Sequence, residues 1–247
     1  MTAALFTARP IAHRGLHDKA RDVMENTAGA ALAAIAHDFA IECDVQLTRD
    51  GEAVVFHDFA LERLTKGEGL VAAQDAAALA RIGFRQGAGG ILKLADFLAL
   101  IGGRVPLVCE VKSRFDGDMR LAVRTLAVVT AQSGPVAIKS FDPAVIAHLR
   151  MLKAPVPLGI VAEAHFTHPD WAWMPAELKT RLIHFLHYDE TRPDFLSWQV
   201  ADFPDAVPFL CRSGLKLPVM TWTVRTDDQR AVAAQWADQM VFEGFVP

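Results

Sequence analysis

Residues 40–45 read Ala40-Ile41-Glu42-Cys43-Asp44-Val45, a pair of acids in an otherwise apolar, β-prone stretch. The pattern predicts a buried strand, and its period of two puts Glu42 and Asp44 on one face. Two like charges a few ångströms apart in a protein interior repel and lose hydration unless a cation lies between them or one is protonated. A divalent metal is the simplest resolution, so the strand predicts a metal site.

A second strand with the same arrangement is expected at residues 107–112, Leu-Val-Cys-Glu-Val-Lys. Glu110 and Lys112 share one of its faces, which implies a metal-bound or anionic partner. Oxygen ligands from Glu42, Asp44 and Glu110 suit Mg²⁺ or Ca²⁺ better than Zn²⁺, which prefers nitrogen and sulfur. The cysteines of both strands fall on the opposite faces and are expected to be small core residues.

The composition favours a soluble globular protein of a single domain spanning residues 1–247. This length fits one α/β barrel, and a hydrophobic content of 52% favours a sheet covered on both sides. A net charge of −4 argues against nucleic-acid binding. Three widely spaced cysteines make no disulfide framework, and the N-terminus has neither a basic segment nor a long apolar run. We expect a cytoplasmic protein without a membrane span.

Strand and helix patterns alternate about eight times along the chain. The turn Arg49-Asp50-Gly51 predicts a hairpin between two of the strands. Residues 59–90, which contain several glycines, are expected to form a short variable insertion after the second strand region. The expected strands are 10–13, 39–47, 53–57, 105–111, 136–140, 157–161, 195–200, 218–224 and 239–242, and the expected helices are 25–38, 94–101, 118–131, 143–152, 175–187, 204–213 and 227–236.

The candidate functional residues decide between two folds for these repeated βα units, a closed barrel and an open doubly wound sheet. His13, residues 42–44, His57 and Glu110 end or follow successive strands, which is where a barrel gathers its functional residues. An open sheet would concentrate them at one crevice, and no glycine-rich phosphate fingerprint follows the first strand. The sequence therefore predicts an α/β fold of the (β/α)₈ TIM-barrel type.

Five short motifs stand in order along the chain: His-Arg-Gly at 13–15, Glu-Asn-Thr at 25–27, Glu-x-Asp at 42–44, His-Asp at 57–58 and Glu-x-Lys at 110–112. They resemble those of the glycerophosphodiester phosphodiesterase family, which belongs to the phosphatidylinositol-phospholipase-C-like TIM-barrel phosphodiesterases. A weaker match follows at Trp222-Thr223-Val224, so the resemblance covers nearly the whole chain. It implies a barrel hydrolase that uses a divalent metal to cleave glycerophosphodiesters to glycerol 3-phosphate and an alcohol.

By this resemblance Glu42, Asp44 and Glu110 would hold the metal, Mg²⁺ or Ca²⁺. Arg14 and Lys112 would bind phosphate oxygens, because a phosphodiester is an anion whose attack builds further charge. His13 and His57 would form the acid–base pair and so need opposite protonation states near neutral pH. We favour His13 as base and His57 as acid. The nucleophile is either metal-bound water or the neighbouring glycerol hydroxyl.

Four further residues are assigned supporting roles. Glu25 is expected to support the site beside the first strand, and Asp58 to support His57. Asn26 is either a helix N-cap or a site residue, since a helix is expected to start there. Trp222 would floor the substrate pocket or fill the barrel.

Two departures from the family pattern limit the assignment. Residues 91–94, Ile-Leu-Lys-Leu, lack the usual proline and threonine, and Phe242-Glu243 stands where the family has Thr-Asp, which leaves Glu243 without a role. The alternatives are therefore a lysophospholipase D or other phosphodiester hydrolase, with an apolar groove near Phe59, Phe84 and Phe166, and a barrel that binds phosphodiesters without turnover. The alcohol and the oligomeric state stay open.

Overall fold

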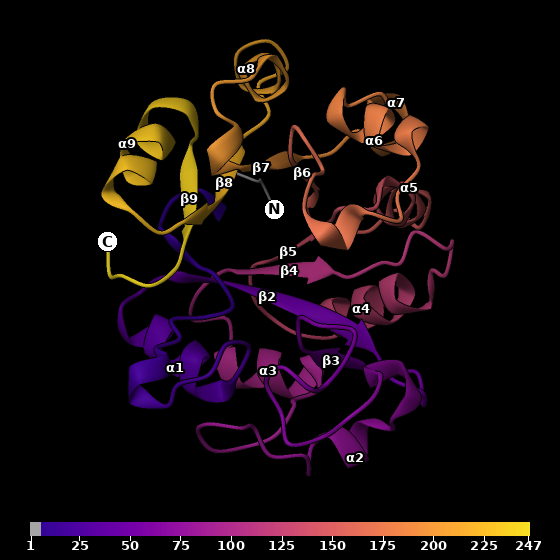
Figure 1. Cartoon of the computed structure of the whole chain (residues 1–247), viewed down its shortest axis with the longest axis vertical. Coiled ribbons are helices and arrows are strands. Elements are labelled where there is room, and N and C mark those ends of the chain that lie inside the picture. Colours follow the sequence, from indigo (N-terminus) through magenta and orange to yellow (C-terminus); the bar gives the residue numbers. More distant parts are fainter. Residues whose placement is uncertain (1–5) are drawn as a thin grey trace.

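The computed structural model, which describes residues 6–247, contains a closed barrel of eight parallel strands surrounded by helices (Figure 1). The strand order is β1-β9-β8-β7-β6-β5-β4-β2, and pairing of β1 with β2 closes the ring. A ninth strand, β3, pairs antiparallel with β2 outside the ring. The predicted TIM barrel and the predicted hairpin are thereby confirmed.

The strands lie close to the predicted ranges. They are β1 Ile11–Ala12, β2 Ala40–Leu47, β3 Ala53–Val55, β4 Leu107–Val111, β5 Val136–Ser140, β6 Leu158–Ala162, β7 Phe195–Gln199, β8 Val219–Val224 and β9 Gln239–Phe242. The helices are α1 Ala28–Ala36, α2 Ala76–Leu79, α3 Leu94–Ile101, α4 Arg120–Thr130, α5 Pro143–Met151, α6 Ala176–Ile183, α7 Tyr188–Thr191, α8 Ala206–Ser213 and α9 Asp227–Trp236. Between residues 6 and 247, no helix is long and apolar enough to cross a membrane.

One predicted helix is divided in two. Residues 175–187 were expected to form a single helix because Leu178, Leu182, Phe185 and Leu186 are spaced to share one side. In the structure α6 ends at Ile183, Phe185 takes a left-handed φ of 57°, and the chain restarts as α7 at Tyr188. A left-handed residue cannot continue a right-handed helix, so the apolar pattern continues across the break without the helix.

The barrel strands alternate between an outer and an inner face. Outward side chains pack against the helices in one large core, which includes both Cys43 and Cys109 as expected. Inward side chains form a separate small cluster at one level of the barrel, made of Phe6, Ile11, Ala40, Val108, Ala137, Phe195, Met220 and Val241. Glu42 and Glu110 each lie two residues beyond a member of this cluster, so the acids lie on the same face, one step nearer the carboxyl ends of the strands.

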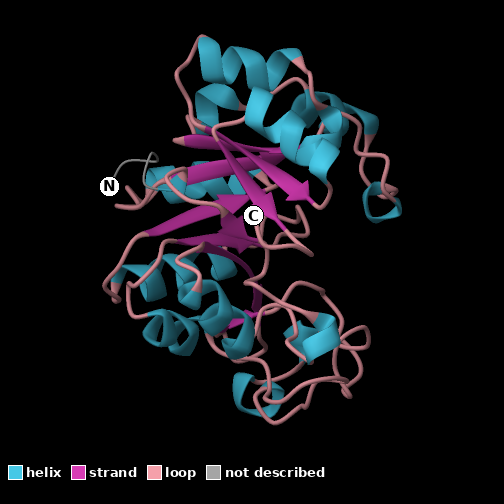
Figure 2. Ribbon diagram, turned by 90° about the vertical axis from the view of Figure 1, so that its left-hand side faces the viewer, coloured by secondary structure: helices cyan, strands magenta, loops and turns pink. Residues whose placement is uncertain are grey.

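The segment between β3 and α3 forms a small lobe of its own. It contains α2 and the short 3-10 helix Val71–Ala73, and its apolar side chains make a second cluster that includes Phe56, Leu61, Leu79 and Phe84. Figure 2 shows the strand arrowheads pointing to the right of the view, towards the open side between this lower lobe and the helices above. Phe84 packs inside the lobe and is not available to line a groove.

The barrel interior is packed closely enough to require a glycine on β6. Gly159 pairs with Phe195 of β7, and a Cβ added at Gly159 would lie 2.2 Å from that ring. Gly159→Ala should therefore lower the free energy of unfolding by about 1–3 kcal/mol, the usual cost of overpacking a core. Urea unfolding of the parent protein and the variant measures this difference in the free energy of unfolding.

Gly83→Ala is the matched control, because a Cβ there meets nothing nearer than Lys66 Cδ at 4.0 Å. We expect this variant to be as stable as the parent protein or slightly more so. Equal stability of the two alanine variants would contradict the packing described for β6 and β7.

Candidate active site

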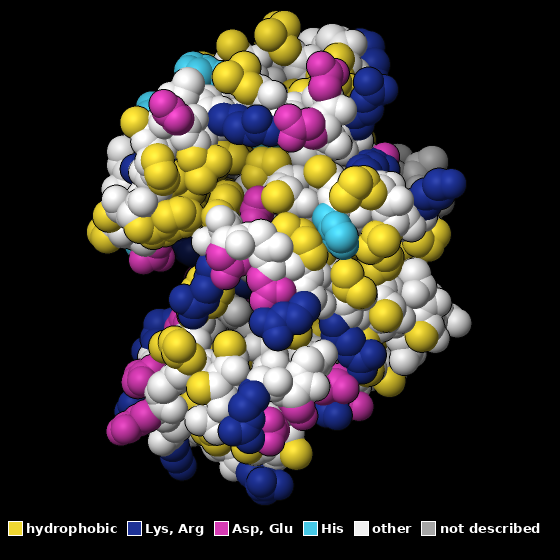
Figure 3. All heavy atoms as spheres, turned by 90° about the vertical axis from the view of Figure 1, so that its right-hand side faces the viewer, with side chains coloured by type: hydrophobic (Ala, Val, Ile, Leu, Met, Phe, Trp, Pro, Cys, Tyr) yellow, Lys and Arg dark blue, Asp and Glu magenta, His cyan; other side chains and the backbone are white. Residues whose placement is uncertain are grey.

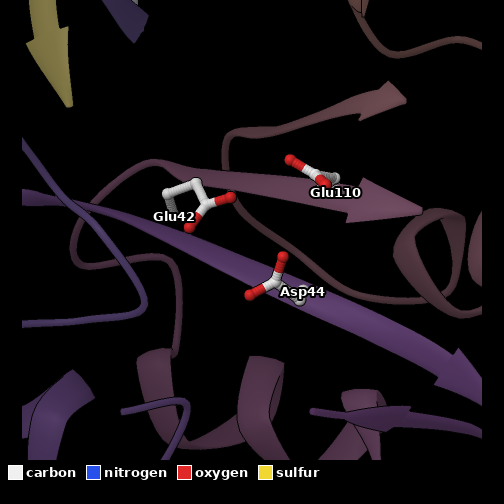
Figure 4. Close-up of side chains that lie close together, drawn as sticks. All are labelled: Glu42, Asp44 and Glu110. Carbon is white, nitrogen blue, oxygen red and sulfur yellow. The ribbon is translucent and has the colours of Figure 1, made fainter. Parts of the chain in front are cut away.

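Three buried carboxylates meet where β2 and β4 approach the open end of the barrel (Figure 4). Glu42 and Asp44 come from alternate positions of β2, and Glu110 pairs in register with Asp44 from β4. One oxygen of each lies within 4.8 Å of the others, and the three residues are at most 5% exposed. The strand pattern of two alternating acids therefore produces the convergent cluster that the sequence predicts.

Three cationic residues surround the cluster. Lys112 Nζ lies 2.8 Å from Asp44 Oδ1 and 2.5 Å from Glu110 Oε1. Lys139 Nζ lies 3.0 Å from Glu42 Oε1 and 3.2 Å from Glu110 Oε2. Arg14 adds its backbone N–H, which donates to Glu42 Oε2 at 3.1 Å, and its Nε, 3.4 Å from Asp44 Oδ2. Every one of the six carboxylate oxygens thus has a polar partner.

These contacts determine which groups are charged. Burial alone would raise the pKa of Asp44, but Lys112, His57 and Arg14 hold it well below its usual value. Glu110 follows the same logic, because Lys112 and Lys139 outweigh burial and lower its pKa. In the other direction, burial opposes the charge on Lys139, yet Glu42 and Glu110 raise its pKa. Asp44 and Glu110 are therefore anionic and Lys139 is cationic at neutral pH.

Each predicted histidine is bound at Nδ1 by a carboxylate. His13 directly follows β1, and its Nδ1 lies 2.7 Å from Glu243 Oε2, just beyond β9. His57 Nδ1 lies 2.7 Å from Asp58 Oδ1. A carboxylate at Nδ1 favours the N–H on that nitrogen and leaves Nε2 for proton transfer. Both imidazoles are thus oriented through Nδ1.

His57 reaches the site on the predicted hairpin. It was expected at the carboxyl end of a barrel strand, but it follows β3, which lies outside the parallel ring. Because β3 runs antiparallel, it returns along β2 until the Phe56 N–H donates to the carbonyl of Asp44. The Gln46 side chain then fixes the His57 carbonyl at 2.9 Å. The hairpin therefore delivers His57 to the level of the acids.

Arg14 also belongs to a network of ion pairs outside the cluster. Its Nη1 donates to Glu25 Oε1 at 2.6 Å, and Glu25 also accepts from Arg63 of the small lobe at 2.8 Å. Arg63 Nε donates in turn to Asp58 Oδ2 at 2.5 Å, which joins the histidine carboxylate to the same network. Burial opposes the charge on Arg14, but Asp44, Glu25 and Glu42 raise its pKa. Glu25 therefore links Arg14 to Arg63.

Asn26 contacts the acid cluster and is not the helix cap. Thr27 takes the N-cap position of α1, where its Oγ1 accepts from Ala30 N. Asn26, 2% exposed, donates from Nδ2 to Asp44 Oδ2 at 2.9 Å and accepts from Asp44 N at 3.3 Å. The first hydrogen bond holds the Asp44 carboxylate and the second holds the Asp44 backbone N–H.

The acid cluster fits a hard divalent cation. Its donors are all carboxylate oxygens, they converge within 4.8 Å, and the described residues contain no other group of acids, histidines or cysteines with that geometry. Such an oxygen set suits Mg²⁺ or Ca²⁺ better than Zn²⁺. Glu42, Asp44 and Glu110 are thus the residues that would hold the metal.

Trp222 lies on β8, across the barrel from the acids on β4. Its Nε1 donates to the Ser197 carbonyl at 3.0 Å, and its ring meets Phe141 edge-on at 5.4 Å between centroids. From Phe141 a row of rings continues through Trp171 and Phe115 to Trp173, which is 52% exposed. Figure 3 shows hydrophobic side chains on the upper wall of the hollow at the left of the view. Trp222 therefore begins an aromatic wall opposite the acids.

Three residues that contact the candidate site were given no role in the sequence analysis. Lys139 was part of an expected strand with no role, Arg63 lay in the variable insertion, and Glu243 was left without an assignment. In the structure, burial opposes ionisation of Glu243, but its hydrogen bond with His13 lowers its pKa to about 2. The signal available in the sequence was position alone, since Glu243 directly follows β9 and Lys139 lies on the strand next to Glu110.

Similarity to solved structures agrees with the fold. The chain is similar to an Oleispira antarctica phosphodiesterase solved in complex with the product sn-glycerol-3-phosphate, with 21% identity, a TM-score of 0.77 and coverage of 98% of this chain and 95% of that chain. A glycerophosphodiester phosphodiesterase from Thermotoga maritima gives 19% identity, a TM-score of 0.70 and coverage of 94% and 92%. These similarities show the shared barrel.

Sequence comparison gives the family. A curated glycerophosphodiester phosphodiesterase from Caldanaerobacter subterraneus subsp. tengcongensis is 48% identical over 62 residues, which span 25% of this chain and only 24% of that relative. A model of the Glycerophosphoryl diester phosphodiesterase family matches residues 13–246, from the first site histidine to the end of the barrel. The chain therefore belongs to the glycerophosphoryl diester phosphodiesterase family.

Proposed function

We propose that this protein hydrolyses glycerophosphodiesters to glycerol 3-phosphate and an alcohol, using a divalent metal and a pair of histidines. The observation that carries the proposal is the presence of two carboxylate-bound imidazoles, His13 and His57, beside one buried acid cluster. A protein that only binds phosphodiesters has no need of an oriented acid–base pair, which argues against the binding-only alternative.

The phosphate would be bound by cations at the mouth of the barrel. Arg14 presents a planar guanidinium held by Glu25, and Lys112 lies two residues beyond Glu110 towards the open end of β4. Both can contact the non-bridging oxygens, where negative charge increases during attack. A divalent ion held by Glu42, Asp44 and Glu110 would polarise the phosphoryl group as a Lewis acid.

The two histidines would then move one proton each. We assign His13 as base: its Nε2 removes the proton from the attacking hydroxyl, whose oxygen forms the new bond to phosphorus. His57 Nε2 gives a proton to the alcohol oxygen as its bond to phosphorus breaks. The attacking hydroxyl is that of water, which gives glycerol 3-phosphate directly, or that of the neighbouring glycerol carbon, which gives a cyclic phosphate that a water molecule must then open. Both routes need the same base. Glu243 and Asp58 stabilise the imidazolium form of their histidine.

The aromatic wall supports lysophospholipids as an alternative substrate class. The rings from Trp222 to Trp173 could accept an acyl chain, as the lysophospholipase D alternative requires. A separate pocket beside Lys112 is lined by Phe59 and Arg114. The Arg114 guanidinium lies over the Phe59 ring, 4.2 Å from its centroid. We give preference to the small glycerophosphodiester, with the cytoplasm as its compartment, which the three free cysteines support.

Hydrolysis of glycerophosphocholine, glycerophosphoethanolamine and lysophosphatidylcholine with Mg²⁺, Ca²⁺ or EDTA tests the proposal. We expect release of glycerol 3-phosphate that EDTA abolishes and added metal restores. His57→Ala should lower turnover by about 100-fold or more on these substrates, because a general acid contributes roughly 10²–10⁴-fold. On a glycerophosphodiester of p-nitrophenol the loss should be much smaller, since that leaving group needs no proton.

Glu177→Gln is the control, because Glu177 is an exposed residue of α6 and should not affect turnover. Activity that survives EDTA would refute the metal assignment. If lysophosphatidylcholine alone is turned over, the protein is a lysophospholipase D and the proposed substrate class is wrong. If no diester is turned over while glycerophosphocholine still binds, the protein is a binding barrel.

Glu243 should matter for the rate and for acid stability. Glu243→Gln removes the charge that orients His13, so we expect kcat to fall by roughly 10–100-fold, in the range found when such supporting contacts are lost, with KM little changed. The Glu243 carboxyl has a pKa of about 2 when folded, against 4.5 ordinarily. Its contribution to stability is therefore present above pH 4.5 and is lost as the pH falls towards 2.

Urea unfolding of both proteins at pH 7 and pH 3 measures the second effect. The stability difference between the parent protein and Glu243→Gln should be larger at pH 7 than at pH 3. A difference that does not change with pH, together with unchanged kcat, would mean that the contact with His13 has no role.

A further inference from the structure

Lys139 is a buried cation in direct contact with two of the three acids. It lies on β5, where it pairs in register with Glu110, which itself pairs with Asp44 on β2. Its side chain is 2% exposed, and Nζ lies 3.0 Å from Glu42 Oε1 and 3.2 Å from Glu110 Oε2. An ammonium therefore bridges the two glutamates from the side of β5.

The position of Lys139 differs from that of Lys112. Lys112 lies two residues beyond Glu110 towards the mouth, where a phosphate enters, and keeps 14% of its side chain exposed. Lys139 lies level with Glu110 in the strand register and has no comparable access to solvent. Its ammonium is therefore placed to act on the carboxylates and not on the substrate.

The three acids of the cluster are in contact with three cationic side chains. Glu42, Asp44 and Glu110 contribute three negative charges, and Arg14, Lys112 and Lys139 contribute three positive charges within 3.4 Å of them. A divalent ion that binds the three acids must approach oxygens that Lys139 contacts, and two cations a few ångströms apart in a low-dielectric site repel strongly.

We propose that Lys139 is a built-in competitor of the divalent metal: its ammonium occupies the Glu42–Glu110 side of the acid cluster, holds the metal-free site together and lowers the affinity for the metal. The inference rests on the metal assignment of the proposed function. It predicts a protein that folds fully before it binds metal and then exchanges the metal readily.

Lys139→Met removes the charge and keeps an unbranched side chain. We expect Ca²⁺ and Mn²⁺ to bind this variant at least tenfold more tightly than the parent protein, equivalent to about 1.4 kcal/mol. Without metal its melting temperature should fall, because Glu42 and Glu110 lose a buried partner. With saturating metal the melting temperature should recover. Calorimetric titration and thermal unfolding of the full chain measure both effects without any activity assay.

Three further variants separate charge from packing. Lys139→Gln should also bind metal more tightly. It replaces Lys139→Met in the test if the methionine variant does not fold. Lys139→Arg keeps the charge and should show no gain. Lys179→Met is the matched control, because that lysine is partly buried but donates to the Phe166 carbonyl at 2.9 Å, away from the acids. It should leave metal affinity unchanged.

Unchanged or weaker metal binding in both neutral variants would overturn the proposal, as would an equal gain in Lys139→Arg. Metal binding by none of the proteins would overturn it together with the metal assignment. Tighter binding in a protein that turns over no diester would instead support Lys139 as competitor while the proposed function fails.

Discussion

Burial of three carboxylates in one cluster is the constraint on which the rest of the site depends. Ionised acids in a protein interior are strongly disfavoured unless they are paired and hydrogen-bonded, and removing one partner of a buried pair commonly costs 3–5 kcal/mol. Here each of the six oxygens has a polar partner, and three cations contact the cluster. The same balance places Arg14 and Lys112 beside a site for an anionic substrate.

The barrel meets this constraint through strand register. Asp44, Glu110 and Lys139 form one row across three neighbouring strands, because β2, β4 and β5 are parallel and in register. The mouth lies on the carboxyl side of this row. Glu42 pairs with Val108, two residues before Asp44, so the acids occupy two successive levels of the inner face. The antiparallel strand β3 is added to this ring and brings His57 back to the acids. The candidate site therefore combines a closed barrel with a hairpin at one position.

The sequence was informative where chemistry is local in the chain. Alternation within 40–45 and 107–112 placed the acids on inner faces and Cys43 and Cys109 in the outer core, as the structure has them. It was uninformative where a role depends on strand neighbours. Lys139 lies in a five-residue strand, and only the adjacency of β4 and β5 reveals its acid partners. Asn26 was predicted to be either the N-cap of a helix or a site residue, and Thr27 takes the N-cap position. Glu243 follows the last strand, and only closure of the ring through β1 brings it to His13.

A crystal structure of the protein soaked in Mn²⁺, with anomalous scattering recorded at the manganese edge, tests the central claim most directly. Mn²⁺ prefers the same oxygen ligands as Mg²⁺ and is identified by its own signal. We expect one strong peak bonded to oxygens of Glu42, Asp44 and Glu110, with the Lys139 ammonium displaced from its present contacts. A saturated crystal without a peak at these carboxylates, or with its peak elsewhere, would contradict the account.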